Sequence, residues 1–266
     1  MFRIVFHKVF IIHDKLCRQG LFYFNVYGTG TISIIYEDYY KYDKYQKGDL
    51  RMYTGNYECL ELFVKPDEGK KGSVLLKNVK ESTTETKEPK HIYGNWIKFP
   101  VSRNTEYEIS TQDCTITFAY LSECENIMEN GICVLDTTDN YKEMNKEEFL
   151  HFIDTPYREQ YHFSPVVNWN NDPNGLCWFK GYYHLFYQMN PFGQEWNNMY
   201  WGHAASKDLV HWTHLPVVLE PQEEILDNLA IKGGAFSGSA LPMGDEVYFY
   251  LTRHIGPQDD GWDTIR

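Results

Sequence analysis

Apolar and polar residues alternate with a period of two through much of the first half of the chain. The alternating segments are rich in β-branched and aromatic residues, which is typical of β-strands. They lie at 21–27, 31–36, 60–64 and 115–120. Short turns rich in Gly, Pro and Asn separate them at spacings typical of a β-sandwich. The pattern predicts an antiparallel β-sandwich, which we place at residues 1–143 as an accessory domain.

Two segments depart from this alternation. Residues 77–90 are rich in Lys, Glu and Thr without periodic apolar positions, which indicates a solvated loop or a ragged edge hairpin. Residues 145–153 can form a short helix with Asn145 as N-cap, and Pro156 ends it. We therefore expect a linker with a short helix at 144–157.

The second half has a different character, because Trp, Asn, His and Gly become more frequent. Alternating strands are predicted at 182–187 and 246–251, joined by polar turns. This pattern is typical of propeller blades, although pattern alone separates propellers poorly from sandwiches. The chain is thus predicted to be all-β, with a third region at 158–266.

Charge and composition narrow the range of partners. The formal net charge of −12 would repel nucleic acids and anionic membranes, so neither is an expected partner. The six cysteines form no C-x-x-C pair, and we expect neither a metal site nor a cofactor. The first ten residues lack the features of a signal peptide, and no apolar stretch is long enough to cross a membrane, which predicts a cytoplasmic protein.

The stretch from Trp169 to Gly175 holds a candidate catalytic carboxylate, Asp172. Its Asn-Asp-Pro-Asn-Gly sequence is dense in turn-forming residues, and it predicts a tight connection between two strands with Asp172 at a strand end. A plain hairpin turn would have the same composition. The choice therefore depends on the motifs that follow.

Four motifs follow one another in the second half. Tyr-His-Phe-Ser-Pro leads into the Asp172 run; a strand carries Gln188; a Trp-rich segment follows; and Phe-Ser-Gly-Ser-Ala comes last. In this order and spacing they resemble the family 32 glycoside hydrolases, which include invertases, inulinases and levanases. The resemblance covers about 158–251.

The resemblance implies a five-bladed β-propeller and a retaining cleavage of β-linked fructosyl units. Asp172 matches the family's nucleophile, and Asn171 matches a residue that hydrogen-bonds fructose. The remaining matches are substrate-binding residues: Gln188, Trp196, Phe236 and Ser237. A retaining glycosidase places its two carboxyl groups about 5–5.5 Å apart. The implied partner is a fructose-containing saccharide. The resemblance does not indicate an oligomeric state.

The sequence also departs from the family pattern. Asn170 stands where the family usually has Met, and Asn197 replaces a Gly. No Arg-Asp-Pro motif and no Glu-Cys motif follows Phe236-Ser237, although the family uses the first to stabilise the transition state and the second as acid/base. We therefore expect the N-terminal fragment of a longer enzyme, ending after about two blades, with an extra N-terminal domain.

Several alternatives stay open. The leading hypothesis is a β-fructofuranosidase acting on sucrose, fructo-oligosaccharide or fructan, by hydrolysis or by fructosyl transfer. A second is a non-catalytic fructan-binding or degenerate module. The related arabinanase and xylosidase group lacks the Asp172 run. The N-terminal region could bind sugar through Trp96, Tyr93 and Tyr57, or those rings could be packing residues.

Overall fold

The structure is a computed structural model in which residues 23–26, 32–35, 50–137, 158–159 and 161–258 are described. Residues 1–46 and 47–266 form two compact units. In the first unit, β1 (Tyr23–Val26) and β2 (Ile32–Ile35) pair as an antiparallel hairpin. The predicted linker and helix at 144–157 lie outside the described residues. The domain boundaries drawn from the sequence stay a prediction.

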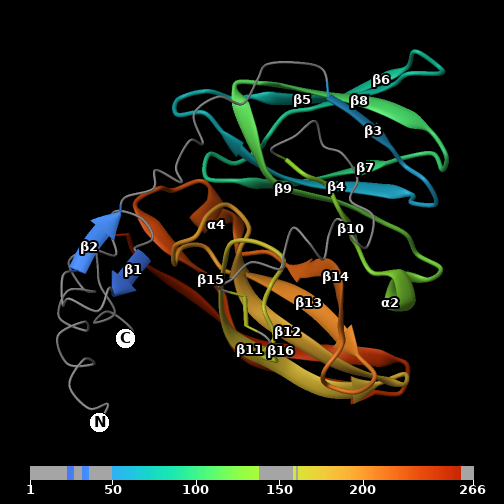
Figure 1. Ribbon diagram of the computed structural model, residues 1–266. Helices are drawn as coiled ribbons and strands as arrows, with labels where there is room; N and C mark the ends of the chain where they lie inside the picture. The colour runs from blue at the N-terminus through green and yellow to red at the C-terminus, as the bar shows by residue number, and fades with distance from the viewer. Residues whose placement is uncertain (1–22, 27–31, 36–49, 138–157, 160, 259–266) are drawn as a thin grey trace, which may run out of the picture. The chain divides into compact units, whose positions relative to one another are not determined.

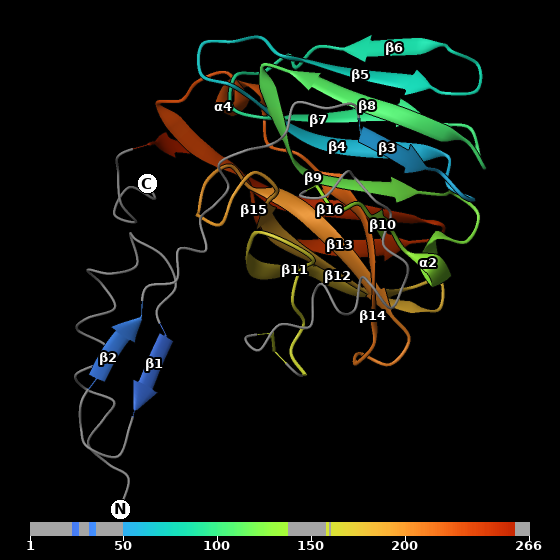
Figure 2. The same cartoon turned by 45° about the horizontal axis from the view of Figure 1, so that its top comes forward.

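The second unit begins with a β-sandwich, as the alternating pattern predicts (Figure 2). Two four-stranded antiparallel sheets have the orders β3-β8-β5-β6 and β10-β9-β4-β7. The strands are β3 (Leu50–Tyr53), β4 (Cys59–Pro66), β5 (Ser73–Asn78), β6 (Thr84–Lys87), β7 (Asn95–Pro100), β8 (Glu106–Gln112), β9 (Cys114–Ser122) and β10 (Cys133–Val134). The polar segment 77–90 forms the edge hairpin β5–β6, one of its two predicted forms.

The sandwich core lies between these two sheets. Leu60, Leu62, Val74, Phe99 and Ile109 are fully enclosed there. Their even spacing within each strand follows from alternation, because every second side chain points to the same face. The prediction of an antiparallel sandwich in this part of the chain is confirmed.

The sheet β10-β9-β4-β7 buries its second face as well. A bulge shifts the register of β9 against β4, so that Phe63 pairs with Phe118 and Val64 pairs with Ile116. Thr117 is the extra residue. The shift reverses the alternation in β9, so Ile116 faces the sandwich core whereas Phe118 faces away from it.

The rest of the unit contains the strands predicted at 182–187 and 246–251 (Figure 1). The elements are β11 (Trp169–Phe179), β12 (Tyr182–Asn190), β13 (Tyr200–Ser206), β14 (Trp212–Leu219), β15 (Ile231–Met243) and β16 (Glu246–Pro257). The first four form one up-and-down antiparallel sheet, β11-β12-β13-β14, and the last two form a hairpin. A four-stranded up-and-down sheet is the form of a propeller blade.

Among the described residues of this unit, two one-turn helices lie between strands. They are α2 (Ile127–Asn130), before β10, and α4 (Glu223–Leu226), before β15. Phe186 and Trp201 of the blade sheet pack against Ala240, Phe249 and Leu251 of the β15–β16 hairpin. The two sheets thus meet at an apolar seam beside the candidate site.

Candidate active site

The Asp172 run is part of a strand, so the predicted strand-to-strand turn is wrong. Residues 169–179 form the single strand β11. β11 is the edge strand of its sheet, where Pro173 removes no inner ladder bond. Turn-forming residues are accommodated because the register against β12 shifts twice, between Asn170 and Pro173 and again between Asn174 and Cys177.

Two bulges hold four of the six predicted site residues. In β11, Asn171 and Asp172 lie between paired positions and together oppose the single residue Gln188 of β12. In β15, Phe236 and Ser237 lie between Ala235 and Gly238 and oppose one residue of β16. A bulge re-aims side chains that regular alternation would send to opposite faces.

Three predicted site residues from three strands form one hydrogen-bonded chain. The Ser237 hydroxyl donates to Oδ2 of Asp172 in a short contact. Nε2 of Gln188 donates to the Ser237 oxygen at 3.3 Å. Gln188 is 3% exposed, whereas Asp172 and Ser237 are exposed. The buried amide therefore orders the hydroxyl that contacts the accessible carboxylate.

A second contact keeps β11 close to β15. Oδ1 of Asn174 accepts a hydrogen bond from the Gly238 amide at 3.1 Å, and Asn174 is 1% exposed. Gly175 has φ +52°, and a Cβ there would lie 2.9 Å from Cβ of Ala240. Glycine at this position allows both the left-handed backbone and the close approach of the two strands.

An aromatic wall is built from the two remaining predicted rings. Trp196 and Phe236 meet edge to face with centroids 6.2 Å apart. Two groups that the sequence did not single out extend this wall: Lys232 places Nζ 4.5 Å from the Trp196 ring centroid, and His254 packs on Phe236 at 4.5 Å. Neither residue belongs to a recognisable motif. The register of β15 against β16 brings both of them to the aromatic wall.

The remaining sequence predictions also have definite places. Gln188 lies on β12, an inner strand of its sheet. Trp201 is fully buried and donates through Nε1 to the carbonyl oxygens of Ala235 at 3.0 Å and Phe236 at 3.2 Å. It is a core residue, and its hydrogen bonds fix the backbone just before Ser237. Asn171 is exposed beside Asp172.

A pair of histidines lies on the seam side of the blade sheet. His184 Nδ1 and His203 Nε2 are 2.9 Å apart, and His203 stacks on Phe186. Burial, with a smaller contribution from His184, lowers the pKa of His203 to about 3. Burial also lowers the pKa of His184, opposed by its contact with the Phe179 carbonyl. Both rings are therefore neutral near pH 7, where one donates to the other.

The chain contains two Glu-Cys dipeptides, both in the sandwich. Oε1 of Glu58 forms an ion pair with Arg103 at 2.9 Å, and Glu123 accepts a hydrogen bond from Asn130 at 2.6 Å. Both therefore have local structural partners. Within the described part of the chain, no group of three His, Cys, Asp or Glu side chains is placed to hold a metal ion, and five cysteines are free.

No helix among the described residues is long and apolar enough to cross a membrane.

Comparison with known sequences relates the second half of the chain to one family. Residues 162–263 match the Glycosyl hydrolases family 32 N-terminal domain. Levanase of Bacillus subtilis is 56% identical over 90 residues, which are 34% of this chain and 12% of that protein. Sucrose-6-phosphate hydrolase of Zymomonas mobilis is 40% identical over 125 residues, 47% of this chain and 23% of that protein. The match therefore spans less than a quarter of either relative.

A solved structure extends the likeness to the sandwich. The glycoside hydrolase family 32 structure from Bifidobacterium adolescentis superposes with a TM-score of 0.72 and 34% identity, covering 80% of this chain and 36% of that one. Residues 158–266 are less than half of this chain. The superposed part must therefore include much of the sandwich.

Proposed function

We propose that this chain belongs to glycoside hydrolase family 32, whose N-terminal domain matches residues 162–263, and that it carries the nucleophile side of a site that cleaves β-fructosidic bonds. The substrates would be sucrose, fructo-oligosaccharide or fructan. The observation that carries the proposal is the hydrogen-bonded chain from Gln188 through Ser237 to Asp172. It brings together three residues that the family motifs assign to one site.

In the proposed reaction, a carboxylate oxygen of Asp172 attacks the anomeric carbon of the fructosyl unit. The bond to the leaving oxygen breaks, that oxygen takes a proton from a general acid, and a fructosyl ester forms on Asp172. Water then attacks the same carbon and releases fructose with retained configuration. Asp172 is suited to the first step because it is exposed and held by one donor on one side.

The other predicted residues would bind the sugar. Trp196 and Phe236 offer an aromatic wall for the apolar face of a furanose ring. Gln188 and Asn171 oppose each other across the β11 bulge and can bond adjacent hydroxyls through amide donors and acceptors. A net charge of −12 favours a neutral saccharide over a nucleic acid as partner.

An activated substrate tests the nucleophile by itself, without the need for a general acid. In β-fructosyl fluoride, fluoride leaves with its electron pair and needs little help from a general acid. We expect the chain to gain the mass of one fructosyl unit, located on Asp172 by peptide mapping. Asp172→Asn should abolish the adduct, whereas Asp245→Asn, at an exposed carboxylate paired with Lys180, should leave it unchanged.

The alternative is a fructan-binding module that performs no chemistry. It predicts saturable binding of fructose or inulin without any adduct, with equal binding by the Asp172→Asn variant. The motif pattern favours the enzyme, because a binding module has no need for a carboxylate with this presentation. An adduct on residues other than Asp172 would contradict the proposed mechanism.

A third experiment addresses turnover. No Arg-Asp-Pro or Glu-Cys motif follows Ser237 in these 266 residues, so we expect no hydrolysis of sucrose or inulin by this polypeptide alone. Hydrolysis that Asp172→Asn abolishes would show that the chain supplies its own acid. The predicted cytoplasmic location stays a prediction.

A further inference from the structure

The strand that carries Gln188 has its opposite face against the sandwich. Along β12, Phe186 and Gln188 point toward the hairpin and Ser237, whereas Leu185, Tyr187 and Met189 alternate to the other side. These three join a buried cluster with Phe63, Phe118 and Tyr120 of the sandwich, which we call the interface cluster. The sandwich thus lies directly behind the strand that orders the site.

Phe63 is the centre of the interface cluster. Its ring is fully buried and contacts sandwich rings on one side, with centroids 5.6 Å from Trp96 and 5.5 Å from Phe118. On the other side it contacts Phe192 at 6.0 Å and Tyr200 at 5.8 Å. Such ring contacts add to the free energy of burying the rings themselves. Trp96 and Tyr93, considered above as sugar-stacking residues, are packed in this cluster.

Buried hydrogen bonds also join the sandwich to the blade sheet. Between the pairs Trp201–Leu219 and His203–Leu215, three residues of β14 oppose one residue of β13. Pro216 has no N–H there, and the Val217 N–H bonds the Tyr120 hydroxyl oxygen at 3.2 Å. That hydroxyl in turn donates to the buried Glu61 carboxylate at 2.9 Å. A sandwich side chain therefore satisfies a backbone donor that the bulged blade sheet leaves free.

Three further hydrogen bonds cross the contact at separate places. Thr117, the bulge residue of β9, donates to the Pro191 carbonyl at 2.9 Å. The Ile132 N–H donates to the His214 carbonyl at 3.0 Å, on the edge strand β14. The Tyr93 N–H donates to the Leu226 carbonyl at 2.9 Å. The contact is thus built over a wide area and covers part of an otherwise open sheet edge.

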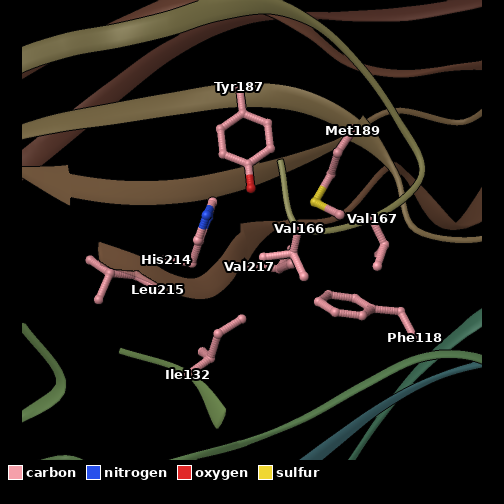
Figure 3. Close-up of a pocket in the computed structure, with 9 residues that line it drawn as sticks. All are labelled: Phe118, Ile132, Val166, Val167, Tyr187, Met189, His214, Leu215 and Val217. Carbon is pink, nitrogen blue, oxygen red and sulfur yellow. The ribbon is translucent and has the colours of Figure 1, made fainter. Parts of the chain in front are cut away.

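A small pocket also lies within the contact (Figure 3). Its lining is predominantly apolar, with Phe118 and Ile132 on one side and Tyr187, Met189 and Val217 on the other. A saccharide site needs several convergent polar groups, so this lining does not fit one.

We propose that the N-terminal sandwich is the fixed back wall of the sheet that carries Gln188, and that it is not a separate carbohydrate-binding module. Its aromatic face is occupied by the blade sheet. Its polar groups complete hydrogen bonds that this sheet needs. The proposal does not depend on the proposed function, because it concerns how the site-bearing sheet is held.

Tyr120→Phe tests the proposal in the full chain with the smallest change. It keeps the ring but leaves the Val217 N–H without its acceptor. We expect amide hydrogen exchange to accelerate roughly tenfold or more in β14 and β12, as for loss of one buried hydrogen bond. Tyr53→Phe is the matched control, because the exposed Tyr53 hydroxyl donates to Asn104 within the sandwich. Faster exchange confined to sandwich peptides would overturn the proposal.

A second measurement guards against misfolding of the variant. In the unaltered chain, exchange is compared with and without inulin or levan. The proposal predicts no fructan protection in β4, β7 and β9, because Phe63, Trp96 and Phe118 of these strands pack in the interface cluster. Protection of the peptide containing Phe63 or Trp96 would show a binding face there and overturn the proposal.

Discussion

The hydroxyl of Ser237 contacts the carboxylate of Asp172 although 65 positions separate the two residues in the sequence. Each lies in a β-bulge, one on β11 and one on β15, and neither would point at the other in regular strands. The contact engages Oδ2 of Asp172, and the bulge sets the direction of the other carboxylate oxygen. It therefore orients the proposed nucleophile before any sugar binds.

Replacing Ser237 by Ala should slow ester formation on Asp172. Without its donor the carboxylate can rotate away from the attacking geometry, and we expect a rate about 10–100-fold lower. Ser237 is exposed, so the melting temperature should stay within about 1–2 °C of the unaltered chain. The measurement is the rate of fructosyl adduct formation with β-fructosyl fluoride.

The matched control is Ser239→Ala, because Ser239 is also exposed and lies two residues further along β15. Its adduct rate should equal that of the unaltered chain. Equal slowing by both variants would point to a general effect on β15 and contradict a specific role for Ser237.

Asn174→Ala should lower stability and disturb the site together. The substitution leaves the Gly238 N–H without its acceptor in a buried place, which costs about 1–3 kcal/mol. Urea denaturation should show this loss, and the adduct rate should fall because Gly238 follows Ser237 directly. Asn170→Ala, at an exposed position of the same strand, should change the unfolding midpoint little. A site effect from Asn174→Ala without a stability loss would contradict this account.

Local pattern was sufficient for the strands, and the motifs were sufficient to nominate the site residues. Alternation at 60–64 and 182–187 was enough to find β4 and β12. The Asp172 run was misread because Pro, Asn and Gly have the same composition in a turn and in a bulged edge strand. Only pairing with β12 distinguishes the two structures.

Contacts between distant strands could not be predicted in this way. Trp96 was a candidate sugar-stacking residue, yet it pairs with Phe63 of the neighbouring strand β4 and stacks on that ring, which itself contacts Tyr200 of the blade sheet. Lys232 and His254 carry no motif and reach the aromatic wall through the register of β15 and β16. The domain boundaries and the residues' chemical roles stay predictions.

Gly94→Ala should destabilise the sandwich–blade contact. A Cβ on Gly94 would lie 2.5 Å from the Phe192 ring, which is buried between Tyr93 and Tyr200 and has little room to move. Overpacking of this kind costs about 1–3 kcal/mol. Gly193→Ala is the control, since a Cβ there would meet its nearest neighbour at 3.8 Å. Equal unfolding midpoints for the two variants, in urea, would contradict the proposed tight packing.

Acid should destabilise the folded chain through the His184–His203 pair. The folded-state pKa of His203, about 3, lies below the value of about 6.5 for an unfolded histidine. Below pH 6.5 the unfolded chain therefore binds protons that the folded chain does not. This contribution to the free energy of unfolding is complete above about pH 6.5 and is lost as the pH falls toward about 3, and the loss reaches about 3 kcal/mol near pH 4.5. Urea denaturation between pH 7 and pH 4.5 measures this loss of stability.

His203→Asn should flatten the dependence of the unfolding free energy on pH, whereas His162→Gln, at an exposed ring, should not. Part of the slope should persist in His203→Asn, because burial also lowers the pKa of His214, to about 4. A slope unchanged by His203→Asn would contradict a lowered folded-state pKa of His203. It would also remove the pair as a source of the acid sensitivity.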